Sequence, residues 1–134
     1  MKILQLLFLV GIMSSCSTET PETPEVKMVL EKDLVDIKDG VYTEWYPGKK
    51  QIKFRGMQDE ASKRDGKWTY YSEKGEELSI TFYEHGLRNG HTIVKHPNGA
   101  IHYTGEYRND TVVGIWTTYD QNGKVISKED HSKD

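Results

Sequence analysis

A glycine followed by an aromatic-rich, alternating run recurs four times, and this repeat constrains the fold more than any other feature of the chain. The copies begin at Gly40, Gly66, Gly90 and Gly114, so they are spaced by 26, 24 and 24 residues. A period in this range is typical of arrays of small supersecondary units. We therefore expect one repeat domain over residues 34–128.

Each copy is predicted to form one β-hairpin. The run after the leading glycine is rich in β-branched and aromatic residues, as in Lys67–Tyr71 and Ile115–Tyr119, and such residues favour strands. A second glycine follows eight or nine residues after the first, as in Asn98-Gly99. Asn-Gly between alternating runs favours a two-residue type I′ turn, in which both central residues take positive φ.

The return strands alternate with a period of two, which separates a buried face from a face toward water. The clearest example is Leu78, Ile80 and Phe82. One hairpin alone is marginally stable in water, so each must pair with the next. The predicted fold is therefore all-β, with repeated β-hairpins forming an elongated single-layer antiparallel meander.

The segment Val26–Lys38 precedes the first hairpin, and its apolar residues fit either a helical stripe or a strand. We favour a short strand over Leu34–Ile37 that pairs with the first hairpin. Asp39-Gly40 would then make the turn, and Asp65-Gly66 and Asn89-Gly90 are expected to turn in the same way.

Residues 1–15 have the organisation of a secretory signal peptide: Lys2, then an apolar run too short to span a bilayer, then small residues. Cys16, the only cysteine, follows them and resembles the lipobox cysteine of bacterial lipoproteins, although Met13 stands where leucine is usual. The alternative is an incidental cysteine beside an ordinary signal. A lone cysteine forms no internal disulfide or CxxC motif, so lipid attachment to Cys16 is the favoured interpretation.

Residues 16–33 are predicted to be the lipid-anchor cysteine and a flexible tether. Ser17–Glu25 is polar, acidic and proline-bearing, with no apolar residue to bury. The acidic stretch resembles the surface-export tag of Bacteroidota lipoproteins. We therefore expect an exported protein that is lipid-anchored in the cell envelope, at the outer membrane. Residues 129–134 form a charged tail.

The charge of the mature chain does not favour a nucleic-acid partner. Removal of residues 1–15 takes away Lys2 and no acid, which leaves 17 basic against 21 acidic residues. No basic stripe or nucleic-acid motif is present. No Ser/His/Asp arrangement, HExxH motif or phosphate-binding glycine loop appears either, so we expect neither an enzyme nor a cofactor. Acids and histidines converging in one pocket would favour an enzyme instead.

Three of the five histidines lie in the third hairpin, which raises the question of a metal site. If Asn98-Gly99 is a two-residue turn, His96 lies opposite Ile101 and His102 lies opposite Lys95. The imidazoles of His96 and His102 would then point to opposite faces of the sheet. We therefore predict no metal site.

Aromatic residues recur at two positions of the repeat, and these positions point to opposite faces. The second position after the leading glycine is expected to form the core stripe, together with Tyr70 and Val94; its aromatic members are Tyr42, Trp68 and Trp116. The fifth-position aromatics are Trp45, Tyr71 and Tyr119. Either turns and long lysine side chains partly cover them, or they form a ladder that stacks on a partner's side chains or on sugar rings.

The run Tyr103–Tyr107, continuing to Gly114–Trp116, is similar to the Tyr-x-Gly-x-aromatic, Gly-x-aromatic pattern of MORN repeats. Residues 34–128 as a whole resemble the variant repeats of the YwqK-type antitoxin family. Two departures are Phe82, where the pattern has glycine, and Thr92, where it has an aromatic residue. The resemblance implies an elongated single-layer sheet with an aromatic face, used for binding proteins or membranes.

These observations favour a membrane-anchored, non-catalytic β-repeat lipoprotein that acts as a protein-binding or scaffolding module. The candidate binding face is Trp45, Tyr71 and Tyr119, and the partners are the membrane, through Cys16, and another protein. The alternative is an antitoxin-like or immunity-like inhibitor of a toxin system, which a neighbouring toxin gene would favour.

Replacement of Cys16 by serine is expected to stop lipoprotein processing, because the thiol that accepts the diacylglycerol is gone. Mass spectrometry of the wild-type mature protein checks the same point. An unmodified Cys16 there contradicts the assignment.

Overall fold

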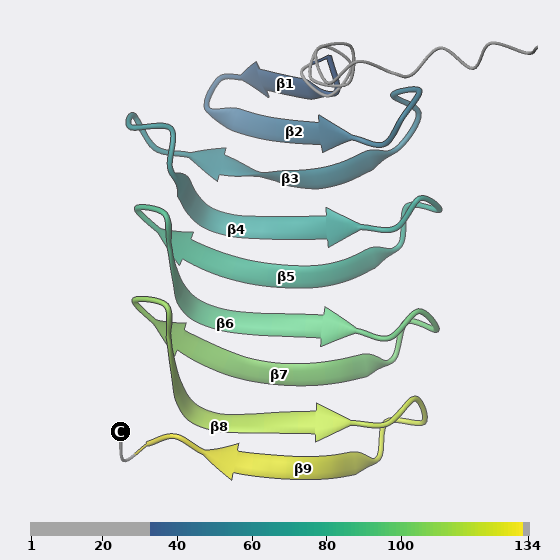
Figure 1. Cartoon of the computed structure of the whole chain (residues 1–134), viewed down its shortest axis with the longest axis vertical. Coiled ribbons are helices and arrows are strands. Elements are labelled where there is room, and N and C mark those ends of the chain that lie inside the picture. Colours follow the sequence, from purple (N-terminus) through teal and green to yellow (C-terminus); the bar gives the residue numbers. More distant parts are fainter. Residues whose placement is uncertain (1–32, 133–134) are drawn as a thin grey trace, which may run out of the picture.

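The computed structural model describes residues 33–132, and these residues form one antiparallel sheet of nine strands. Neighbouring strands follow one another in the chain, so the sheet is a continuous meander (Figure 1). The strands are β1 Val35–Lys38, β2 Val41–Trp45, β3 Ile52–Gln58, β4 Arg64–Tyr71, β5 Glu77–Glu84, β6 Leu87–Lys95, β7 Ile101–Arg108, β8 Thr111–Tyr119 and β9 Val125–Asp130. This confirms the predicted all-β meander, including the short strand before the first hairpin. The predicted signal peptide, Cys16 and the tether up to residue 32 lie outside the described residues.

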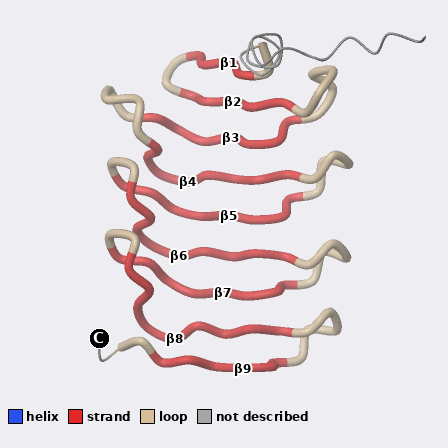
Figure 2. The backbone as a smooth tube through the Cα atoms, in the orientation of Figure 1, coloured by secondary structure: helices blue, strands red, loops and turns tan. Residues whose placement is uncertain are grey.

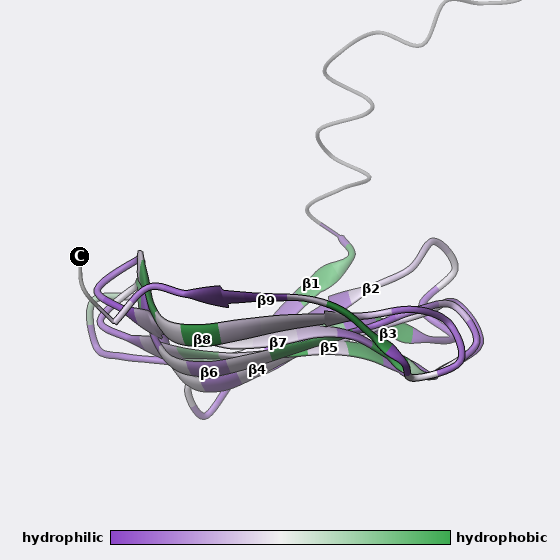
Figure 3. Cartoon of the chain, turned by 90° about the horizontal axis from the view of Figure 1, so that it is seen from below, coloured by the Kyte–Doolittle hydropathy of each residue, from purple (hydrophilic) through white to green (hydrophobic). Residues whose placement is uncertain are grey.

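The sheet is a single layer. Seen along the stack of strands in Figure 3, no described element packs against either face. Very little is therefore buried, and Trp68, with 4% of its surface exposed, is the one buried hydrophobic side chain within residues 33–132. Such a sheet depends on cross-strand side-chain pairs and on its backbone ladder rather than on an interior core.

The turns after β4, β6 and β8 differ from the predicted type. In the third hairpin the Gly99 N–H donates to the His96 carbonyl at 2.9 Å, and the His96 N–H donates to the Ala100 carbonyl at 2.8 Å. Gly99 has a φ of 84°, whereas Asn98 is not in the positive-φ region. This is a type I turn followed by a left-handed glycine, and Pro97 suits its second position because its φ is fixed near −65°.

The different turn changes the pairing of the third hairpin only beside the turn, because Val94 still pairs with Tyr103 as a two-residue turn requires. The predicted placement of the histidines next to the turn is wrong. Lys95 pairs with Ile101, after a register shift between Val94 and Lys95. The rings of His96 and His102 lie 4.3 Å apart and not on opposite faces.

Type I′ turns occur instead at the other side of the sheet, where a return strand meets the next repeat. Both central residues have positive φ at Asp39-Gly40, His85-Gly86 and Asn109-Asp110. The Asp39-Gly40 turn is confirmed. The predicted turns at Asp65-Gly66 and Asn89-Gly90 are wrong, because those residues lie inside β4 and β6.

The leading glycines bend the strands that contain them. Gly66, Gly90 and Gly114 have φ values of 69°, 106° and 66°, a region that glycine occupies without steric cost. Met57 of β3 pairs with Asp65 of β4, and the next residue of β3, Gly56, pairs with Trp68. Two residues of β4, Gly66 and Lys67, are therefore left without a partner in β3. The result is a β-bulge, and Figure 2 shows β4, β6 and β8 changing direction near their starts.

Truncation of Trp68 to alanine is expected to lower the free energy of unfolding by about 3–5 kcal/mol, because the side chain is buried. Trp116 is half-buried, so its truncation should cost less. Urea unfolding measures both. Ile115→Ala is the control, since 61% of Ile115 is exposed; equal stability of the Trp68 and Ile115 variants contradicts the assignment of Trp68 to the core.

Candidate binding surfaces

The strand register assigns each side chain to one of two faces, because directly paired residues point to the same side of an antiparallel sheet. The face that carries Trp68 and Trp116 is called the tryptophan face. One row on it consists of successively paired residues: Tyr42, Gly56, Trp68, Thr81, Thr92 and Gly105. The opposite face is called the ladder face, and it carries Trp45, Tyr71 and Tyr119.

All three fifth-position aromatics lie on the ladder face, each next to a turn, and each is half-buried. The ladder is interrupted, because the third copy has Lys95 at this position. Trp45 and Tyr71 are two strands apart, or roughly 10 Å, whereas Tyr119 is four strands beyond Tyr71, or roughly 19 Å. Trp45 and Tyr71 can therefore act together on a small contact, and Tyr119 can join them only on an extended partner.

Two open hollows lie side by side on the ladder face. They have volumes of about 420 and 430 Å³ and share Val41 and Arg55. The first is lined by Tyr71 and Lys67, and the second by Trp45. The structure thus places two of the three predicted aromatics beside concave surface.

The ladder face also carries exposed apolar side chains and a small charged network. Glu77 Oε1 lies 3.4 Å from Lys95 Nζ, and Glu77 Oε2 lies 3.9 Å from Lys67 Nζ. The exposed apolar residues of this face are Met57, Phe82, Ile101, Ile115 and Val125. The expectation that Phe82 lies on a buried face with Leu78 and Ile80 is wrong, because Phe82 pairs with Lys67 on the ladder face and is 40% exposed.

Neighbouring hairpins hold the backbone of the ladder residues. The Tyr46 hydroxyl donates to the Tyr71 carbonyl at 2.8 Å, and His96 Nε2 donates to the Tyr119 carbonyl at 3.0 Å. Burial and a hydrogen bond with Tyr70 raise the pKa of Tyr46 to about 12. These links fix the ladder residues relative to the hairpin before them.

The tryptophan face carries two aromatic clusters. In the first, the ring of Trp68 lies 5.3 Å from that of Tyr42 and 6.2 Å from that of Tyr83. In the second, Trp116 lies 5.9 Å from Tyr103 and 4.9 Å from Tyr107. These contacts confirm that the second-position tryptophans form the main packing stripe.

Both tryptophans lie over a glycine. A Cβ atom at Gly56 would be 2.3 Å from the Trp68 ring, and one at Gly105 would be 2.2 Å from the Trp116 ring. Neither distance is possible for a real side chain, so each indole requires glycine opposite it.

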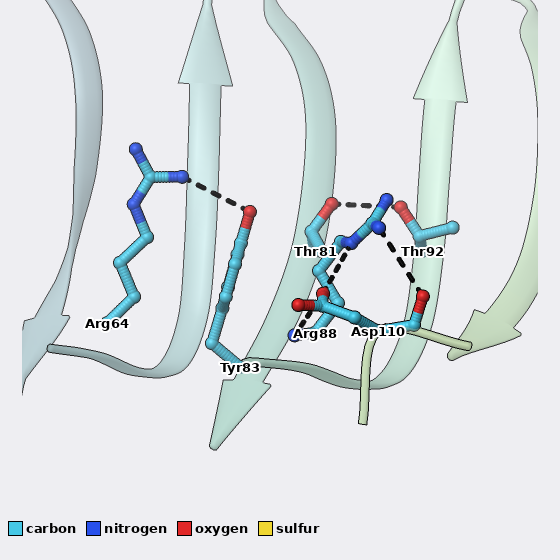
Figure 4. A network of polar contacts seen from close by, with 6 residues as sticks. All are labelled: Arg64, Thr81, Tyr83, Arg88, Thr92 and Asp110. Atoms are coloured by element: carbon cyan, nitrogen blue, oxygen red, sulfur yellow. Dashed lines mark hydrogen bonds and ion pairs between the residues drawn. The ribbon is translucent and has the colours of Figure 1, made fainter. Parts of the chain in front are cut away.

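The third copy lacks the aromatic residue at its second position, and the second copy lacks the glycine opposite it. Thr92 pairs with Thr81, and the two hydroxyl oxygens lie 2.9 Å apart (Figure 4). Thr81, and not Phe82 as the sequence comparison placed it, therefore occupies the glycine position. Threonine at both positions is consistent, because a residue opposite Thr92 does not need to leave space for an indole ring.

An arginine two residues before the leading glycine covers an aromatic ring in two copies. The Arg64 guanidinium carbon lies 4.4 Å from the Trp68 ring centroid, and Nη1 donates to the Tyr83 hydroxyl at 3.1 Å (Figure 4). Arg88 lies 4.0 Å from the Tyr107 ring centroid. Its Nε donates to Asp110 at 2.8 Å, and this bond raises the pKa of Arg88 and lowers that of Asp110.

Within residues 33–132 there is no group of three or more histidine, cysteine, aspartate or glutamate side chains that could hold a metal ion. The same residues include no helix long and apolar enough to cross a membrane. No protein-family model, curated protein or solved structure matches the chain. The likeness to MORN repeats therefore remains a proposal from the sequence pattern.

Gly105→Ala is expected to destabilise the sheet by about 1–3 kcal/mol, because the new methyl group collides with the Trp116 ring. The double variant Gly105→Ala with Trp116→Ala should cost less than the sum of the two single variants, since the ring is gone. Urea unfolding of the three variants gives the coupling. Strictly additive costs contradict the proposed contact.

Proposed function

We propose that this chain is a non-catalytic binding module, held at a membrane of the cell envelope through a lipid on Cys16, and that it binds another protein through its ladder face. The observation that carries the proposal is the uncovered ladder face itself, on which half-buried rings lie among exposed apolar side chains. Exposed apolar surface of this kind marks interaction sites in soluble domains.

The lining of the first hollow indicates the chemistry of the partner. Val41, Met57 and Tyr71 supply apolar surface, and Arg55 and Lys67 supply positive charge. This combination suits a protein segment that presents an apolar side chain flanked by carboxylates. The hollows are open depressions of the sheet, which suits a protein surface better than an enclosed small molecule.

The triple variant Trp45→Ala, Tyr71→Ala, Tyr119→Ala is expected to weaken partner binding by about 2 kcal/mol or more, because it removes large, rigid contact area. Its thermal unfolding should change far less than that of Trp68→Ala. The partner is first captured from membranes with the tethered protein and purified, and its affinity is then measured for each variant.

Ile37→Ala is the matched control, because Ile37 is 61% exposed and lies on the tryptophan face. It should retain full affinity. A folded triple variant that binds as tightly as wild type removes the ladder from the interface. If the triple variant does not fold, the three single variants decide the same question, and unfolding of each assigns the ladder to the folding core instead.

A further inference from the structure

A cavity of about 360 Å³ lies beside Trp116 at the C-terminal end of the tryptophan face, and we call it the Trp116 cavity. It is formed by β7 and β8 with β9 and the residue after it. Its lining residues are Tyr103, Val112, Trp116, Thr118, Glu129 and His131.

The corresponding place two repeats earlier, the Trp68 cavity, has a volume of only about 60 Å³. The two are equivalent by register: Phe54 pairs with Tyr70 as Tyr103 pairs with Thr118. Trp68 likewise pairs with Thr81 as Trp116 pairs with Glu129. The Trp68 cavity and the Trp116 cavity can therefore be compared as a filled and an open form of the same site.

Two larger side chains fill the Trp68 cavity: Tyr70, where the Trp116 cavity has Thr118, and Arg64. The Arg64 guanidinium lies 4.4 Å from the Trp68 ring centroid and 5.3 Å from that of Tyr83. The residue at the same repeat position in the last copy is Val112, which is short and uncharged. The Trp116 cavity therefore has an aromatic wall, as the Trp68 cavity does, but has no arginine over the indole ring.

The Trp116 cavity also has a negative charge that the Trp68 cavity lacks. Glu129 replaces Thr81 opposite the indole, and 67% of its side chain is exposed. Its Oε2 lies 3.6 Å from His131 Nε2, beside the opening. An indole face and a carboxylate together attract a cation, and a planar guanidinium can stack on the ring while donating to the carboxylate.

We propose that the Trp116 cavity binds the guanidinium of an arginine side chain from another protein, in the place that Arg64 occupies over Trp68. The arginine stacks on Trp116 and donates hydrogen bonds to Glu129. This site is on the opposite face from the ladder and does not depend on the function proposed above.

The test titrates the mature chain, ¹⁵N-labelled at tryptophan, with N-acetyl-arginine amide and separately with N-acetyl-citrulline amide. Citrulline keeps the shape of the side chain and lacks its charge. The indole N–H resonance of Trp116 should shift saturably with the arginine probe and much less with citrulline, while those of Trp45 and Trp68 stay in place. Equal shifts with both probes, or no saturable shift up to about 100 mM, overturn the proposal.

Three variants localise the effect. Val112→Arg should fill the cavity from within and abolish the shift, whereas Thr111→Arg adds the same charge on the neighbouring exposed residue and should leave binding unchanged. Glu129→Gln should weaken binding about tenfold. The dispersion of the spectrum reports that each variant is folded, and undiminished binding to Val112→Arg overturns the proposal.

Discussion

The indole of Trp68 lies over Gly56 and that of Trp116 lies over Gly105, and most of the remaining packing depends on these two contacts. In a sheet without a second layer, a large apolar side chain can be removed from water only by lying across its own sheet. Glycine opposite the indole leaves the necessary space, since any Cβ there would overlap the ring. Tyr42 and Tyr83 then pack against Trp68, as Tyr103 and Tyr107 pack against Trp116.

The two faces of the sheet consequently have different roles. The tryptophan face makes the cross-strand contacts that stabilise the meander, and the ladder face is left with half-buried rings, exposed apolar residues and a lysine-glutamate network. Because the aromatic clusters lie on one face, exposed side chains of the other face can change with little effect on folding. A sheet of this kind can therefore carry a binding surface along its whole length.

The repeats have similar backbones and different side chains, and one of these differences changes from the N-terminal to the C-terminal end of the sheet. The position two residues before the leading glycine is Arg64, Arg88 and Val112 in successive copies. The first covers Trp68 and the second covers Tyr107, but the third is too short to cover Trp116. An arginine therefore covers the tryptophan at the Trp68 end of the tryptophan face, and none covers the tryptophan at the Trp116 end. The regular period of the repeat does not reveal this difference.

The sequence by itself determined the number of hairpins, the meander and the faces of the second-position and fifth-position aromatics, because a two-residue alternation and a repeat period are local properties of a strand. It did not determine the turn types. Asn98-Gly99 suits a type I′ turn and equally a type I turn with a left-handed glycine, and a glycine such as Gly66 has the same positive φ in a turn as in a bulge. Only the tertiary structure decided the contact of His96 with His102 and the open space beside Trp116, which involve more than one strand, and the position of Arg64 over Trp68, which depends on the bulge at Gly66 within β4. The turn type changes the pairs beside it, as with Lys95 and Ile101, and a cavity needs side chains from three strands to be placed together. No spacing within a single strand can specify either.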